Sequence, residues 1–226
     1  AGLAMKARTG KETNSAKPSP LPEVSGKNNK LTCGNFKIEN PRGDVDAQLM
    51  MYNLANAKGN SVTYGDISVS ASNLDFSGLG HLLNSEPKEN FYPQLTADNH
   101  FKAGNIDITA KTAGTVALMF GSQDKDQPAK KCSAQAKSFN VTLTDAAAEK
   151  PTYIGGLTAF GQSDIKDSRI AVGDVKVASA SQKNLYFGLG AARAQNTTHS
   201  GNTVFVDKNI EVNHAGSIYG GGYGGF

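Results

Sequence analysis

The sequence of 226 residues contains no tryptophan, only two cysteines, eight prolines and 19% charged residues. The low proline content and the net charge of +3 exclude a collagen-like chain and a highly charged disordered chain. No run approaches the roughly 18 consecutive apolar residues of a membrane-spanning helix. The first residues lack a basic stretch followed by an apolar block. We therefore expect either a cytosolic protein or the mature or trimmed form of an exported one.

The positive charge is concentrated in residues 1–30, which contain six basic and two acidic residues. The rest of the chain is nearly neutral and has no basic stripe interleaved with aromatic residues, so we do not expect nucleic-acid binding. Residues 1–30 also lack any apolar periodicity and contain the run PSPLP. This composition predicts a disordered, solvated tether.

From about residue 31 the chain alternates polar and apolar residues over short stretches, as in Val62, Tyr64, Ile67 and Val69. This period of two predicts β-strands, and residues 31–103 are expected to form a small N-terminal β-rich handle. Residues 77–103 interrupt the alternation and are predicted to be a long irregular loop, which in a compact protein is usually functional or a linker.

Residues 104–226 divide into eight strand-like pieces separated by turn-rich segments. Regular spacing and glycines within the strands predict an antiparallel meander that closes into an eight-stranded β-barrel, where sharp bends require glycine. A two-sheet sandwich is the alternative architecture. The sequence thus predicts an all-β protein with a handle over 31–103 and a barrel over 104–226.

The end of the chain, Gly216–Gly220 followed by Gly221–Phe226, carries the pattern of a glycine-bounded strand pair. This pattern resembles the C-terminal eight-stranded barrel of bacterial surface lipoproteins exported by Slam-type outer-membrane translocators, a group that includes transferrin-binding protein B and the hemophilins. The resemblance covers about residues 104–226. It implies a secreted or outer-membrane-surface protein of a Gram-negative bacterium, with a Slam-type translocator as a partner and a lipid anchor as the only membrane contact.

The two cysteines, Cys33 and Cys132, belong to no CxxC motif and have no histidine at metal-binding spacing. An extracellular setting favours one long-range disulfide between them, which would stabilise the fold by about 4–5 kcal/mol in the chain-entropy model. In a cytosolic protein the same two residues would be buried thiols.

Catalytic motifs are missing from the sequence: there is no HExxH and no GxSxG, so we do not expect an enzyme. The hemophilin resemblance implies haem as a ligand, held by histidine from a loop. His81 is flanked by apolar residues on both sides, and His100 follows in the same irregular segment beside Phe101. His81 is the expected iron ligand, and His100, Phe91 and Tyr92 are the other expected ligand-binding residues. The alternative is that both histidines are ordinary loop residues.

These observations predict a non-enzymatic binding protein that captures haem or a host haemoprotein. The alternative is a surface lipoprotein that serves host association or colonisation, binds a host surface ligand and takes up no haem.

The two functions differ in their response to haem. If His81 ligates the iron, titration with haem produces a Soret band that is lost in His81→Ala. A flat absorption spectrum at micromolar haem would eliminate haem capture and leave the colonisation alternative.

Overall fold

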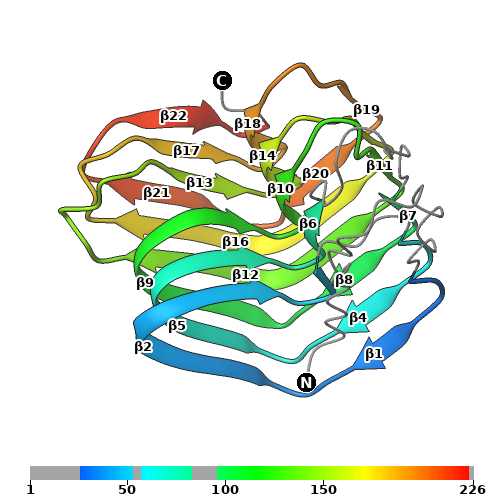
Figure 1. Ribbon diagram of the computed structural model, residues 1–226, viewed down its shortest axis with the longest axis horizontal. Coiled ribbons are helices and arrows are strands. Elements are labelled where there is room, and N and C mark those ends of the chain that lie inside the picture. Colours follow the sequence, from blue (N-terminus) through cyan, green and yellow to red (C-terminus); the bar gives the residue numbers. More distant parts are fainter. Residues whose placement is uncertain (1–25, 53–56, 83–95, 224–226) are drawn as a thin grey trace, which may run out of the picture.

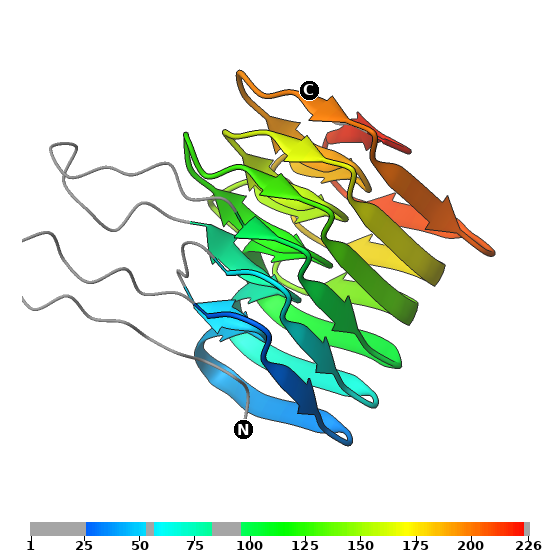
Figure 2. The same cartoon turned by 90° about the vertical axis from the view of Figure 1, so that its right-hand side faces the viewer.

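The computed structural model describes residues 26–52, 57–82 and 96–223. The described chain consists of 22 strands and no helix. It winds as a parallel β-solenoid of about five turns. The turns lie on one another in sequence order, from β1 and β2 at one end to β22 at the other (Figure 1 and Figure 2).

The strands of successive turns form three sheets with 13, five and four members. The 13-stranded sheet contains β1 (Lys30–Thr32), β2 (Phe36–Gln48), β4 (Ser61–Thr63), β5 (Ile67–Ser77), β8 (His100–Lys102), β9 (Asn105–Ala117), β12 (Ser133–Leu143), β13 (Thr152–Gly155), β16 (Arg169–Ser179), β17 (Leu185–Gly188), β20 (Thr203–Val206), β21 (Ile210–His214) and β22 (Ile218–Gly221). The five-stranded sheet contains β3 (Met51–Tyr52), β6 (Gly80–Leu82), β10 (Phe120–Gln123), β14 (Thr158–Gly161) and β18 (Ala191–Ala194). The four-stranded sheet contains β7 (Thr96–Ala97), β11 (Ala129–Lys130), β15 (Ile165–Lys166) and β19 (His199–Ser200).

The predicted all-β class is confirmed, but the antiparallel barrel with a separate handle is wrong. Most of the predicted strand-like pieces are strands, yet each pairs in parallel with the equivalent piece one turn away, as β12 does with β9 and β16. The predicted boundary at residue 104 falls inside the stack, because β5 pairs with β9. The two-sheet sandwich is equally excluded. An alternation of two residues is common to parallel and antiparallel strands, so it could not identify the partners.

The core is a set of apolar columns that run along the stack. Ile67, Ile106, Phe139 and Val175 occupy one register position in four successive turns, and each is fully buried. Because the strands are in register, every inward-pointing side chain packs on its equivalents above and below. The segment predicted to be an irregular loop contributes β6, β7 and β8 to this stack, and residues 83–95 lie outside the described residues.

A ladder of amides marks one corner of the coil. The side-chain amide of Asn29 donates to Asn60 Oδ1, and that of Asn60 donates to Asn99 Oδ1, both at 2.9 Å. Asn60 Nδ2 also donates to the carbonyl of Gly26, and Asn99 Nδ2 donates to the carbonyl of Ala57. Cys132, Ser168 and Asn202 continue the ladder, and successive members are between 31 and 39 residues apart. Buried amides are thus satisfied between turns, which fixes their register.

The residue before each ladder position has a left-handed backbone conformation. Glycine, asparagine and aspartate tolerate this conformation best, and they hold five of the six positions. The six residues, with φ between 52° and 69°, are Asn28, Gly59, Asp98, Lys131, Asp167 and Gly201.

A second polar ladder lies at the starts of the long strands β2, β5, β9 and β12. The side-chain oxygen of Asn35 accepts the N–H of Asp66, and Asp66 Oδ1 accepts the N–H of Asn105 at 2.8 Å. Asn105 Oδ1 in turn accepts the hydroxyl of Ser138. Each of these residues therefore caps the following turn, and the same two corners recur through the stack.

Disrupting the amide ladder should destabilise the coil. Asn60→Ala removes buried hydrogen bonds to two neighbouring turns and leaves their partners unsatisfied, so we expect a loss of about 2–3 kcal/mol. Asn213→Ala is the matched control, because the Asn213 side chain donates only to the exposed Glu211. Urea denaturation of both variants checks this. Equal midpoints would contradict the role of the ladder.

Candidate functional site

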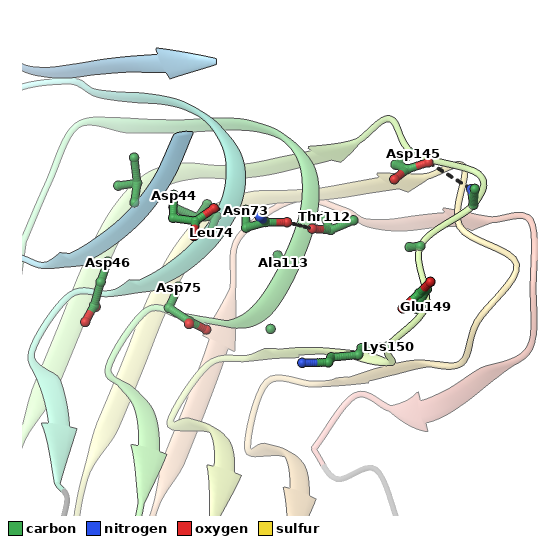
Figure 3. Close-up of a pocket in the computed structure, with 14 residues that line it drawn as sticks. Asp44, Asp46, Asn73, Leu74, Asp75, Thr112, Ala113, Asp145, Glu149 and Lys150 are labelled. Atoms are coloured by element: carbon green, nitrogen blue, oxygen red, sulfur yellow. Dashed lines mark hydrogen bonds between the residues drawn. The ribbon is translucent and has the colours of Figure 1, made fainter. Parts of the chain in front are cut away.

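A groove lies on the outside of the first three turns. It has a volume of about 800 Å³. One wall is formed by β2, β5 and β9 where these long strands bend, and the other by the segment after β12 (Figure 3). The lining residues are Asp44, Val45, Asp46, Asn73, Leu74, Asp75, Thr112, Ala113, Gly114, Asp145, Ala147, Ala148, Glu149 and Lys150.

A hydrogen-bonded row of polar side chains crosses the strand wall. Asn73 Nδ2 donates to Asp44 Oδ1 at 2.6 Å, and the Thr112 hydroxyl donates to Asn73 Oδ1. The three residues come from β2, β5 and β9, so the row runs along the stack (Figure 3). These contacts orient the side chains and hold the Asp44 carboxylate at the end of the row.

A second row places two carboxylates side by side. Asp46 and Asp75 are register partners in β2 and β5, so their backbones are about 4.8 Å apart. Asp75 Oδ1 accepts the N–H and the hydroxyl of Thr115, both at 2.8 Å. Asp46 accepts the side-chain amide of Gln48 at 3.0 Å. Like charges at directly opposite positions oppose folding, and a cation placed between them would relieve this repulsion.

The opposite wall exists because the fourth turn is longer than the third. β9 continues around the bend to Ala117, whereas the chain after β12 pairs with β9 only as far as Asp145 and then leaves the stack until β13 begins at Thr152. Asp145 Oδ1 accepts the N–H of Ala147 at 2.9 Å, which closes a turn. The Thr152 hydroxyl donates to the carbonyl of Ala113 and anchors the returning chain. Glu149 and Lys150 lie between these anchors (Figure 3).

The groove is electronegative. Its lining holds five carboxylates, those of Asp44, Asp46, Asp75, Asp145 and Glu149, and one ammonium group, that of Lys150. Among the described residues, none of the five carboxylates forms an ion pair. Concave surfaces lined by one sign of charge concentrate the field, so this groove attracts cations.

His81, the expected haem ligand, lies in β6 inside the coil. Only 7% of the residue is exposed, and its backbone N–H donates to Gln48 Oε1 at 3.1 Å. Its Nε2 lies 2.5 Å from where a Cβ on Gly121 would be, so the imidazole packs directly on the next turn. Burial lowers the pKa of His81, an effect that the carboxylates of Asp46 and Asp75 oppose. Among the residues described, no cluster of three or more metal-binding side chains is present.

The structure does not bring the other expected ligand-binding residues to His81. His100 lies in β8, in a different sheet from β6, and its exposed ring forms a 2.8 Å hydrogen bond with the Ser133 hydroxyl. Phe91 and Tyr92 lie outside the described residues. Leu79 and Leu82, two of the apolar neighbours that singled out His81, are core residues, and His81 is buried with them.

The expected disulfide between Cys33 and Cys132 is not formed. Cys33 follows β1 in the first turn, and Cys132 precedes β12 in the fourth, where it replaces asparagine in the amide ladder. Strands stacked at about 4.8 Å per turn separate the two far beyond the reach of a disulfide. Burial raises the pKa of the Cys132 thiol to about 11.

Comparison with protein-family models, with curated proteins and with solved structures gave no match. In the described ranges, no helix is long and apolar enough to cross a membrane.

The buried imidazole makes stability depend on pH. Because the pKa of His81 is lowered in the folded chain, the unfolded chain binds a proton first as the pH falls below about 6.5. The free energy of unfolding should thus fall between about pH 7 and pH 5, by at most about 1.4 kcal/mol per pH unit for this group. His81→Phe should reduce this dependence and His100→Gln should not, as measured by urea denaturation across the range. Identical pH dependence of the unfolding free energy in wild type and His81→Phe would contradict the role of His81.

Proposed function

We propose that this chain is a non-enzymatic binding protein, and that the acidic groove captures a cationic ligand. The observation that carries the proposal is the excess of carboxylates in one 800 Å³ groove. The proposal retains the sequence-based prediction of a binding protein and moves the binding site from the histidines to the bend of β2, β5 and β9.

Binding is favoured over catalysis by the kinds of side chain present. The residues described as lining the groove include no serine, cysteine or histidine, so no serine–histidine or cysteine–histidine pair is assembled there. The carboxylates of Asp44, Asp75 and Asp145 are instead held by neighbouring N–H, amide or hydroxyl donors. Oriented, charged acceptors are suited to recognising a cation.

An extended peptide rich in lysine or arginine fits the groove best. The carboxylates of Asp46 and Asp75 repeat along the stack at the spacing of the strands, and Glu149 faces them from the other wall. An extended peptide presents side chains on one face about every 6.6 Å, so several ammonium or guanidinium groups can reach carboxylates of different turns. Such a contact is mainly electrostatic and weakens with salt.

The expected location, secreted or on the outer-membrane surface of a bacterium, remains part of the proposal. A host surface ligand with a basic segment would satisfy both the groove and the predicted role in host association. Haem capture through His81 stays a separate prediction, because His81 does not line the groove.

An oligolysine peptide tests the proposal. We expect measurable binding at low ionic strength by calorimetry, and a steep loss of affinity as salt increases. Asp46→Asn/Asp75→Asn should weaken binding about tenfold, since each exposed ion pair contributes about 0.2–1 kcal/mol. Asp207→Asn is the matched control, because Asp207 is exposed in the last turn, away from the groove.

Two results would overturn the proposal. One is the absence of oligolysine binding at low salt. The other is an equal loss of affinity in Asp207→Asn and in the double variant, which would show attraction by the overall charge of the chain rather than by the groove.

A further inference from the structure

The last turn of the solenoid exposes side chains that earlier turns bury. Ile210 is the register partner of Val175, and Ile218 is the partner of Leu185. Val175 and Leu185 are fully buried, whereas Ile210 and Ile218 are 43% and 47% exposed. In the described chain, all five large apolar side chains that are exposed lie between Phe205 and Tyr223. The final turn thus presents core positions that no described residue covers.

The two ends of the stack also present open strand edges. β21 pairs with β16 and β2 pairs with β5, and neither has a second partner among the described strands. An open parallel edge offers a row of backbone donors and acceptors to another strand. We propose that a second copy of this chain stacks head to tail, with its first turn on the last turn of its neighbour.

The amide ladder supports this pairing, because its two ends are complementary. Within the chain, the Oδ1 of each asparagine after Asn29 in the ladder accepts the N–H of the ladder residue one turn earlier, as Asn60 does for Asn29 and Asn202 does for Ser168. At the junction, Asn29 of the next copy would accept the N–H of Asn202. The corner caps match in the same way, since Asn209 precedes β21 at the register position from which Asn35 caps Asp66.

The register also predicts matched side chains across the junction. Continuing the register of the stack places Phe36 of the next copy on Ile210 and Ile38 on Val212. Between these apolar pairs, Lys37 of the next copy, whose ammonium lies 2.7 Å from Glu39 in its own strand, is placed directly opposite Glu211. Opposite charges at facing positions in neighbouring strands stabilise the pairing. A second copy therefore satisfies the backbone, the apolar positions and the charges of the open edge together.

A head-to-tail contact uses two different surfaces of each copy, so it builds open rows rather than closed dimers. We expect sedimentation velocity of the full chain to show oligomers that grow with protein concentration. Electron microscopy should show rods of constant width, each copy adding about 25–30 Å at roughly 4.8 Å per turn.

Charge reversal at the junction provides the specific test. Glu211→Lys and Lys37→Glu each place like charges opposite one another, and each should weaken self-association about tenfold. An equimolar mixture of the two variants should restore association, because every junction then pairs lysine with glutamate. Lys102→Glu, an exposed reversal in the third turn, is the matched control and should associate like wild type.

A second variant tests the apolar contribution independently. Ile218→Lys changes a side chain that is already 47% exposed, so the folded monomer should persist while stacking is lost. Circular dichroism verifies the fold of each variant. A wild-type chain that stays monomeric up to its solubility limit would overturn the proposal. Particles that grow in width, or a mixture of the charge variants that fails to recover, would overturn it equally.

Discussion

The in-register stacking of one turn on the next is the constraint on which the rest of this structure depends. Each strand satisfies its backbone with the strand one turn away, so no turn has a complete set of hydrogen bonds alone. Buried amides such as Asn60 and Asn99 tie the register at one corner, and Asp66 and Asn105 tie it at another. A shift of one residue would turn the apolar columns outward and break both ladders together.

The same stacking determines what the surface displays. A side chain that points outward is repeated along the coil by its register partners, which produces rows rather than isolated residues. In the first turns the row is polar and acidic, with Asp46 beside Asp75. In the last turns the equivalent row is aromatic, and the rings of Tyr153, Tyr186 and Tyr219 stack at 5.0 and 5.2 Å. The groove and the open end are therefore two consequences of one repeat.

The sequence was sufficient to predict strands but not their partners. Alternation identified pieces such as residues 168–179, which contain β16, while the glycines suggested the bends of a barrel. Glycines at the corners instead allow turns to approach closely, since a Cβ on Gly156 would collide with the carbonyl oxygen of Leu189. The parallel arrangement was readable from a repeat, because residues 59–70, 98–109 and 167–178 read GNSVTYGDISVS, DNHFKAGNIDIT and DSRIAVGDVKVA.

The groove was harder to predict, because its residues are far apart in the sequence. Asp44, Asp75 and Glu149 belong to no local motif, and they meet only because three turns bend beside a longer fourth turn. Aligning the repeats would have placed Asp46 next to Asp75, but the insertion that forms the opposite wall breaks the repeat.

Paired cysteines test the parallel stack most directly. In a Cys33→Ser/Cys132→Ser background, cysteines can replace Lys102 and Gln135, which are exposed register partners in neighbouring turns. Gln135 and the half-buried Ala171 are the next such pair. Mild oxidation should link 102 to 135 and 135 to 171, whereas 102 and 171, two turns apart, should stay reduced. Failure of both neighbouring pairs to form, or ready formation of the 102–171 bond, would contradict the solenoid.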